Sequence, residues 1–233
     1  MERESGAGRP IGRLFVVATP IGNLEDITLR ALRILSEVEA IACEDTRETV
    51  KVLARHGLRK RLISYFQPHE GRKLPEIIGL LKAGRDVALV SDAGTPGVSD
   101  PGFPLIREAL REGIAVIPVP GASAATAALS ASGLPTHRFL FAGFPPPKKA
   151  GLLKLLVLLK GEPGTLVFYV PTRRLPEFLK AALETLGDRR VVIARELTKI
   201  HEEFIRGTAA ELVGKLGPVR LKGEATVLVE GLK

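Results

Sequence analysis

The sequence predicts an α/β fold of two α/β domains, the first built on a mostly parallel sheet and the second on a mixed sheet. Two observations support this prediction. Through the first half of the chain, short apolar runs alternate with helix-period segments, a pattern typical of parallel, helix-covered sheets. In the second half, two strands are expected close together at 202–206 and 224–230, around only a short helix at 209–215. Strands without a full crossover helix between them run antiparallel, which makes the second sheet mixed.

The first half is expected to contain five strands, each followed by a helix. The strands are the apolar runs at 14–18, 40–43, 62–65, 87–90 and 115–119. Asn23 or Asp26 is expected to cap the first helix, because a side-chain oxygen there can accept hydrogen bonds from the first turn. The later helices are expected at 49–55, 74–82, 103–111 and 123–132.

The second half is expected to be organised differently. Besides the two strands already named, it contains strands at 139–144, 165–170 and 191–194, and helices at 152–159 and up to residue 186. Chain breaks at 133–135 and 145–147, rich in glycine and proline, indicate a linker region between the halves. We expect a disordered leader over 1–10, an N-terminal α/β domain over 11–121 and a C-terminal α/β domain over 122–233.

Composition limits the class of protein. The 233 residues are 45% hydrophobic, which is enough for real cores. The net charge of +8 favours an acidic partner such as RNA or a phosphorylated ligand, but it fits a solvated basic surface equally well. One cysteine excludes an intrachain disulfide, and the four histidines show no zinc-ligand spacing. Since no secretory signal or membrane-length apolar helix is recognised, we expect a cytoplasmic protein with no metal and no membrane partner.

The most informative stretch is the loop at 91–102, which directly follows the apolar strand at 87–90. It contains three glycines, two prolines and two aspartates. Glycines permit backbone conformations and close approaches that a Cβ atom forbids, and prolines stiffen the loop. In open α/β sheets, ligands bind at loops that follow the carboxyl ends of strands. The sequence therefore predicts a ligand site here, and the alternative is a tight turn that binds nothing. Glycine-containing turns also follow the first and fifth strands.

Four segments, at 14–26, 43–47, 91–102 and 119–124, together resemble the ribosomal RNA small subunit methyltransferase I family of the tetrapyrrole methylase superfamily. The resemblance implies two α/β domains of the tetrapyrrole methylase type, with S-adenosyl-L-methionine bound in the cleft between them and usually a homodimer. The implied activity is 2′-O-methylation of a cytidine ribose in 16S ribosomal RNA of the small subunit. The first turn, Ala18-Thr19-Pro20-Ile21-Gly22-Asn23, departs from the Gly-x-Gly-Pro-Gly-Asp of tetrapyrrole-modifying members and matches the RNA-methylating branch.

The resemblance also implies a set of donor-binding residues spread over both halves. Backbone N–H groups of glycine-rich turns suit the carboxylate of the methionine part, and apolar side chains at 98, 170 and 197 suit the adenine. Taken singly, each residue is equally compatible with ordinary turn or core packing. The implied residues are Ile21, Gly22, Ala93, Gly94, Thr95, Val98, Ser123, Ala124, Val170 and Leu197.

A ribose hydroxyl is a poor nucleophile, so a nearby carboxylate or histidine that takes its proton would accelerate methyl transfer. The candidates are Glu44 and Asp45, where the second strand ends, and Asp92 and Asp100 in the central loop. Two alternatives stay open. Asp100 precedes a proline and suits a turn, and Glu44 or Asp45 suits a structural ion pair with Arg47.

Basic residues are the candidates for holding RNA phosphates, namely Arg47, Lys148, Lys149, Arg173 and Arg174, and a solvated surface is the alternative for each. Two rival functions remain. One is a tetrapyrrole C-methyltransferase of precorrin type with the same fold and donor, which the first turn disfavours. The other is a non-catalytic RNA- or nucleotide-binding protein, which three separate glycine-containing turns disfavour.

Overall fold

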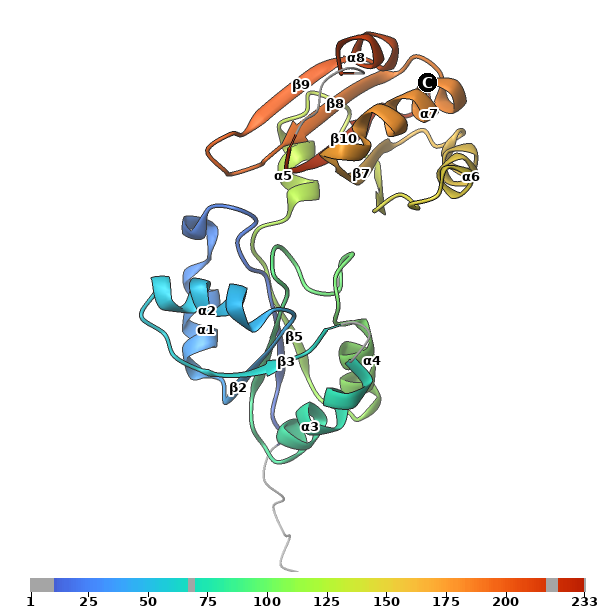
Figure 1. Ribbon diagram of the computed structural model, residues 1–233. Helices are drawn as coiled ribbons and strands as arrows, with labels where there is room; N and C mark the ends of the chain where they lie inside the picture. The colour runs from blue at the N-terminus through green and yellow to red at the C-terminus, as the bar shows by residue number, and fades with distance from the viewer. Residues whose placement is uncertain (1–10, 67–69, 217–221, 233) are drawn as a thin grey trace, which may run out of the picture. The chain divides into compact units, whose positions relative to one another are not determined.

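The computed structural model describes residues 11–66, 70–216 and 222–232, so the leader expected at 1–10 lies outside the described residues. The chain divides into two compact units, 1–122 and 123–233. Each unit is built on its own five-stranded sheet (Figure 1).

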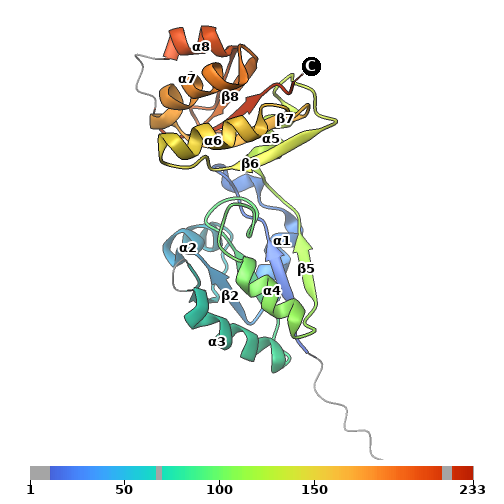
Figure 2. The same cartoon turned by 90° about the vertical axis from the view of Figure 1, so that its right-hand side faces the viewer.

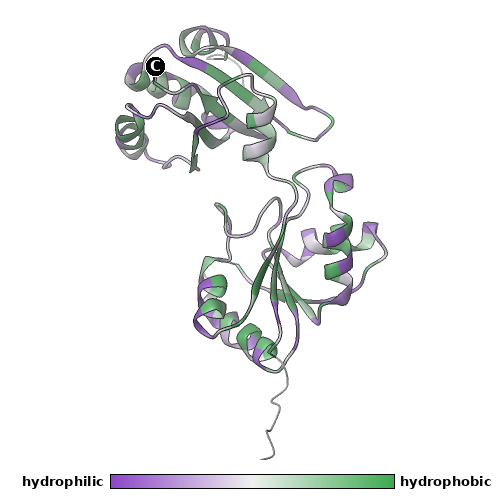
Figure 3. Cartoon of the chain, turned by 180° about the vertical axis from the view of Figure 1, so that it is seen from behind, coloured by the Kyte–Doolittle hydropathy of each residue, from purple (hydrophilic) through white to green (hydrophobic). Residues whose placement is uncertain are grey.

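The first unit contains a sheet of parallel strands in the order β3-β2-β4-β1-β5. Four of its strands are apolar runs, as expected for strands covered by helices on both faces (Figure 3), whereas the edge strand β3 begins with Arg61 and ends with Ser64. The strands are β1 (Leu14–Val17), β2 (Ala40–Cys43), β3 (Arg61–Ser64), β4 (Val87–Val90) and β5 (Val116–Val119). The helices are α1 (Leu29–Glu37), α2 (Thr46–Arg55), α3 (Glu70–Lys82) and α4 (Phe103–Arg111).

Two apolar layers hold the first unit together, one on each face of its sheet. Helices α1 and α2 cover one face, where Ile34 and Leu53 pack against Ile41 and Val90. Helices α3 and α4 cover the other face, where Leu81 and Leu105 pack with Leu14, Leu89 and their neighbours (Figure 1). Because each strand feeds the next through a helix, all five strands point their carboxyl ends to one edge of the sheet.

The second unit contains a mixed sheet in the order β6-β7-β10-β8-β9, in which only β6 and β7 run parallel. The predicted mixed sheet is therefore confirmed, although β9 and β10 each pair with β8 rather than with each other. The strands are β6 (Phe139–Gly143), β7 (Thr165–Pro171), β8 (Arg190–Arg195), β9 (Glu203–Thr208) and β10 (Glu224–Val229). The helices are α5 (Ala124–Ser130), α6 (Lys149–Leu159), α7 (Leu175–Leu186) and α8 (Ala209–Leu216).

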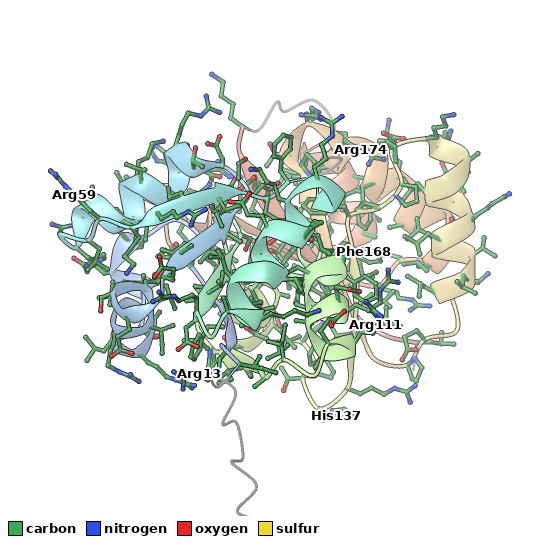
Figure 4. All side chains as sticks on the ribbon, turned by 90° about the horizontal axis from the view of Figure 1, so that it is seen from below. Arg13, Arg59, Arg111, His137, Phe168 and Arg174 are labelled. Carbon is green, nitrogen blue, oxygen red and sulfur yellow. The ribbon has the colours of Figure 1, made fainter. Side chains whose placement is uncertain are left out.

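Helices α6, α7 and α8 pack on one face of this second sheet (Figure 2). Phe168 lies inside that core, with its ring centroid 5.1 Å from that of Phe178 (Figure 4). Side chains alternate along β7, so Tyr169 points to the opposite face, where its hydroxyl accepts a hydrogen bond from the N–H of Ala125 in α5 (3.3 Å). The short helix α5 therefore covers the other face.

Helix beginnings are the main local difference from the sequence prediction. Helix α1 is capped by Thr28, whose Oγ1 accepts from the Ala31 N–H (3.0 Å), while Asn23 caps a separate 3-10 turn, η1 (Leu24–Asp26). Helix α2 begins three residues earlier than predicted, because Asp45 provides its cap. Helix α3 begins at Glu70 rather than at 74 and contains Pro75, so that proline does not mark the helix start.

The predicted linker region at 133–147 is wrong, because this segment lies within the second unit. Strand β6 pairs with β7 from Phe139 to Gly143. The prolines that follow are held by Arg174, whose guanidinium donates to the carbonyl oxygens of Pro145 (3.0 Å), Pro146 (2.7 Å) and Pro147 (3.3 Å). A proline run that looks like a break in the sequence is thus a fixed turn.

Candidate functional site

Two of the predicted ligand turns, those after β1 and β4, are joined at the carboxyl edge of the first sheet. Thr19 and Gly94 exchange backbone hydrogen bonds in both directions, at 2.9 and 3.0 Å. The Thr19 hydroxyl, which is buried, also donates to the carbonyl of Ser91 (3.0 Å). Because β1 and β4 are neighbours in the sheet, their turns leave it side by side and pair.

The turn after β5 closes on the same place, since β5 is the other neighbour of β1. The Thr95 hydroxyl donates to the carbonyl of Ala122 (3.5 Å), and a Cβ atom on Gly121 would lie 3.0 Å from the Cβ of Ala18. The three turns therefore approach each other more closely than larger residues would allow.

Gly94 lies at the centre of these turns and adopts a φ of +80°. A Cβ atom added there would lie 3.6 Å from Cγ2 of Ile21 and 3.9 Å from the carbonyl oxygen of Ala122. These are ordinary contact distances, so the space between the turns admits a small group next to the glycine backbone. The predicted residues Ile21, Gly94 and Thr95 are brought together, and Gly22 and Ala93 adjoin them in the chain.

The rest of the central loop is held in a fixed shape. The N–H of Gly97 donates to the Pro101 carbonyl (3.2 Å), and that of Val98 donates to the Thr95 carbonyl (3.3 Å). Gly102, at a φ of +134°, packs so closely on β4 that a Cβ atom would lie 2.9 Å from Cδ2 of Leu89. This shape leaves the side chain of Val98 45% exposed, so it is available for an apolar contact.

Acidic side chains gather at the same edge, where β2 and β4 end next to each other. Oδ1 of Asp92 accepts a hydrogen bond from the Asp45 N–H (2.9 Å), which ties the ends of the two strands together. Burial raises the pKa of Glu44, and the negative charges of Asp92 and Asp100 raise it further. Burial likewise raises the pKa of Asp100, although a hydrogen bond with Ser91 opposes this. A carboxylate with a raised pKa is a stronger proton acceptor.

Asp45 differs from these carboxylates. It forms an ion pair with Arg47, with Oδ2 2.5 Å from Nη2, and its Oδ1 accepts from the Arg47 N–H (2.8 Å). These hydrogen bonds lower the pKa of Asp45 to about 2. The structural ion pair left open by the sequence is therefore formed by Asp45, whose carboxylate caps α2 and is a weak base.

Asp92 is a candidate base by its residue type and its place in the central loop, and the structure gives it a second role. Burial raises its pKa, while its hydrogen bond with the Asp45 N–H lowers it and the negative charge of Asp45 raises it. Asp92 connects the end of β2 to the start of the central loop. This positioning role arises because β2 and β4 are neighbours in the sheet, an order of strands that we did not predict from the sequence.

The remaining predicted donor residues belong to the second unit. Ser123 stands at the N-cap position of α5 and Ala124 is its first residue. Val170 is 1% exposed and its side chain lies in the apolar core beneath α6, α7 and α8. Contact of Val170 with an adenine stays a prediction, and its buried side chain favours a contact through its main chain. That main chain lies near the end of β7, beyond Phe168, where the pairing of β7 with β6 ends.

Leu197, also in the second unit, lies between two residues in an uncommon backbone conformation. Glu196 has a φ of +50° and Thr198 a φ of +65°, backbone angles that residues other than glycine rarely adopt. The Glu196 carboxylate accepts from the Glu224 N–H (3.1 Å) and from the Lys199 ammonium (3.1 Å). Strained backbone that is held by surrounding hydrogen bonds is common at functional sites.

Gly223 makes this arrangement possible, and sequence reasoning missed it. A Cβ atom there would lie 2.3 Å from Oε1 of Glu196. The segment Glu196–Thr198 and Gly223 pack against each other, and we call them together the second loop. Nothing in the composition of 196–198 signals a positive φ.

The predicted phosphate-binding residues divide into two groups. The side chain of Arg174 is 16% exposed, and its guanidinium donates to the carbonyls of the proline turn, which gives it a structural role; phosphate binding by Arg174 stays a prediction. The guanidinium of Arg47 is engaged by Asp45 but remains largely exposed. The others, Arg173, Lys148 and Lys149, are exposed, and the two lysines begin α6.

Within the described ranges, no group of three or more His, Cys, Asp or Glu side chains is arranged to hold a metal ion. A search of the same residues finds no helix that is long and apolar enough to cross a membrane.

Comparison with known proteins adds the family. The family model of tetrapyrrole (corrin/porphyrin) methylases matches residues 13–213. The ribosomal RNA small subunit methyltransferase I of Halalkalibacterium halodurans is 49% identical over 94% of this chain and 76% of that protein. The protein of the same name from Thermotoga maritima is 47% identical over 95% of this chain and 99% of its own length. Among solved structures, uroporphyrin-III-C-methyltransferase from Thermus thermophilus is similar with a TM-score of 0.67 and 26% identity over 94% of both chains.

Proposed function

This chain belongs to the tetrapyrrole methylase family, and on that premise we propose that it methylates 16S ribosomal RNA of the small subunit, using S-adenosyl-L-methionine. The proposed target is the 2′-hydroxyl of one cytidine ribose. The observation that carries the proposal is the high identity, over nearly the whole chain, to relatives named as small-subunit ribosomal RNA methyltransferases. The first turn, with Ile21 before Gly22, supports the same branch of the family.

The residues of the first unit fit the methyl donor. The three joined turns offer backbone around Gly94, with room for a small group between Ile21 and Ala122. Backbone N–H groups in such turns suit the donor's carboxylate, and the exposed Val98 suits its adenine. When bound, the donor supplies a methyl group already activated on a sulfonium, so the protein's task is alignment and proton removal. The donor-binding residues that we propose are Ile21, Gly22, Ala93, Gly94, Thr95, Val98, Ser123, Ala124, Leu197 and the main chain of Val170.

Two carboxylates at the same edge of the first sheet suit proton removal from the ribose hydroxyl. We assign this role to Asp100, with Glu44 as its neighbour, because burial raises the pKa of both. Each then holds a proton more strongly than an exposed carboxylate does. Asp45 positions α2 rather than accepting the proton, since Arg47 keeps its pKa at about 2.

Exposed cations suit the phosphates that flank the target nucleotide. Lys148, Lys149 and Arg173 are exposed, and Arg47 keeps most of its guanidinium in solvent. Phosphate contacts of this kind position an RNA without reading its sequence, and they make binding depend on salt. We assign them that role, with Arg174 holding the turn that precedes the two lysines.

The proposal extends to assembly and location. We propose that the protein acts as a homodimer in the cytoplasm, where ribosomal subunits are assembled. Sedimentation velocity over a range of protein concentrations tests the first part, and a single monomeric species at all concentrations would contradict it.

The test of the activity uses S-adenosyl-L-methionine labelled on its methyl group and small ribosomal subunits that lack the modification. After incubation, nuclease digestion and mass spectrometry locate the label. We expect one labelled 2′-O-methylcytidine in 16S ribosomal RNA. Uroporphyrin III and precorrin substrates are offered in parallel. Label on a tetrapyrrole with none on RNA would overturn the proposal in favour of C-methylation.

A further inference from the structure

Phe103 is an aromatic residue in an unusual place. It is the first residue of α4 and directly follows the central loop. Its side chain is 62% exposed, although a phenylalanine normally buries most of its surface. The guanidinium carbon of Arg107, one helical turn on, lies 5.4 Å from the centroid of its ring. The two side chains form a cation–π pair that projects from the helix into solvent.

The pair lies at the same edge of the sheet as the acidic residues. Leu105 and Ala109 are fully buried against the sheet, so α4 runs back along β4 from its carboxyl end, and Phe103 marks that end. Asp100 is three residues earlier, and three residues span at most about 10 Å. Phe103 is therefore close to the carboxylate to which we assign proton removal.

For methylation, the ribose hydroxyl must be aligned with the donor, and binding of a neighbouring base helps to hold the ribose in place. Proteins that recognise unpaired RNA stack its bases on aromatic side chains and on guanidinium planes. Such stacking suits any base, because every base has a π-face. In the described part of the chain Arg107 takes part in no ion pair, so its charge remains available to attract RNA phosphate.

We propose that Phe103 and Arg107 form a stacking platform for an unpaired base of the substrate RNA, beside the ribose that is methylated. The inference rests on the proposed function, and it adds the residues that hold the nucleotide in place. Phe103 is a binding residue here, and Arg107 both orients its ring and contacts the RNA.

A second copy of this chain is the competing occupant of the surface. Leu110 lies two helical turns beyond Phe103 on α4 and is 61% exposed, so the two residues share an exposed face. An apolar contact with another copy would use both residues. Stacking of a base at the active edge uses Phe103 alone, and the neighbouring cation favours a polyanion over a protein surface that carries a net charge of +8.

The experiment compares Phe103→Leu, Phe103→Tyr and the matched control Leu110→Ala with the parent protein. Small ribosomal subunits that lack the modification serve as substrate, and kcat/KM for methyl transfer is measured. From the usual contribution of stacking to the binding of one base, we expect Phe103→Leu to lose about 5- to 150-fold in kcat/KM. Tyr keeps the aromatic face, so Phe103→Tyr and Leu110→Ala are expected to stay within about threefold of the parent.

Three further measurements make the result decisive. Calorimetric titration of S-adenosyl-L-methionine and thermal unfolding should be unchanged in Phe103→Leu, and sedimentation should show the parent's oligomeric state. Equal kcat/KM in Phe103→Leu and the parent overturns the inference and leaves the proposed function intact. A change of oligomeric state shared by Phe103→Leu and Leu110→Ala identifies a protein interface and also overturns it. No methyl transfer to RNA by the parent protein overturns both.

Discussion

The central loop of the first unit and the second loop of the second unit achieve unusual backbone shapes by different means. The central loop uses glycines at its turning points, with Gly94 at a φ of +80° and Gly102 at +134°. The second loop places Glu196 and Thr198 at positive φ and holds them there with hydrogen bonds. Glycine makes such a conformation inexpensive, whereas a side chain must be held in place by its neighbours.

The two loops also treat their carboxylates in opposite ways. Burial raises the pKa of Asp100 in the central loop. Burial raises the pKa of Glu196 too, but hydrogen bonds from the Glu224 N–H and from Lys199 outweigh it and lower the pKa below its usual value. The carboxylate with the raised pKa, Asp100, is the one to which we assign proton removal, whereas the carboxylate of Glu196 holds a backbone in place.

The largest expected effect separates these two roles. Asp100→Asn removes the proposed base and should lower kcat for methyl transfer by about 10²- to 10⁴-fold, the usual contribution of general base catalysis. Glu196→Gln should change kcat far less and instead lower the thermal stability. Single-turnover transfer to small subunits measures the first effect and calorimetric unfolding the second. Equal losses of kcat in both variants would remove the distinction.

The parent protein should show the matching pH dependence. The base must be deprotonated to act, so kcat/KM should fall as the pH is lowered through the pKa of Asp100. Because that pKa is raised, the fall should begin at a higher pH than for an exposed aspartate. A pH profile of kcat/KM that stays flat down to the usual aspartate range would contradict the assignment.

The next effect tests the glycine of the central loop. Gly94→Ala adds a Cβ atom between Ile21 and Ala122, where we place the donor, and should reduce donor affinity by about 100-fold or more in calorimetric titration. Gly113→Ala is the matched control, since Gly113 has a φ of +70° and nothing within 4 Å of an added Cβ. Both variants should lose about 1–2 kcal/mol of unfolding free energy, because both force a side chain into the left-handed region. Unchanged donor affinity in Gly94→Ala would remove this glycine from the site.

A smaller effect tests the second loop. Gly223→Ala would bring a Cβ atom within 2.3 Å of Oε1 of Glu196, so the carboxylate must move away from Glu224 and Lys199. Gly187→Ala is its control, since Gly187 has a φ of +89° and open space around an added Cβ. We expect Gly223→Ala to cost about 1–3 kcal/mol more unfolding free energy than the control, in urea titration. Equal costs would show that the contact between Gly223 and Glu196 does not hold the loop.

The smallest effect concerns Asp45. Its folded pKa of about 2 lies below its usual value of 3.8, so its ion pair with Arg47 stabilises the fold above pH 3.8, and this stabilisation is lost as the pH falls through 2. Asp45→Asn keeps a capping oxygen but loses the ion pair. In urea titrations at pH 6 and pH 3, the unfolding free energies of the variant and the parent should differ less at the lower pH. A constant difference between them would contradict the account.

What the sequence predicts depends on how each feature is encoded. The order of strands and helices follows from apolar periodicity, and the turns at the carboxyl edge of the first sheet follow from their glycines, of which Gly94 and Gly102 adopt a positive φ. The face of a strand is harder to predict. Strand β7 is buried on both faces, so its apolar run gives no sign that Val170 points into the core and Tyr169 away from it.

The sequence also does not predict which hydrogen-bond partner a charged side chain takes in the folded chain. Asp45 has the residue type of a base, but its place before α2 makes it a cap. Arg174 has the residue type of a phosphate ligand, but the carbonyls of three consecutive prolines surround its guanidinium. Both outcomes depend on groups that only the folded chain brings within reach. By contrast, Arg59 is exposed and projects into solvent from the first unit, as its residue type leads one to expect (Figure 4).

The central claim is that Asp100, at the carboxyl edge of the first sheet, assists methyl transfer to a ribose of 16S ribosomal RNA. The most direct measurement locates the labelled methyl group in small subunits treated with the parent protein or with Asp100→Asn, under conditions where both bind the donor. The account predicts one labelled cytidine 2′-oxygen with the parent and at least a hundredfold slower labelling with the variant. Label on a base, or equal rates with both proteins, would contradict it.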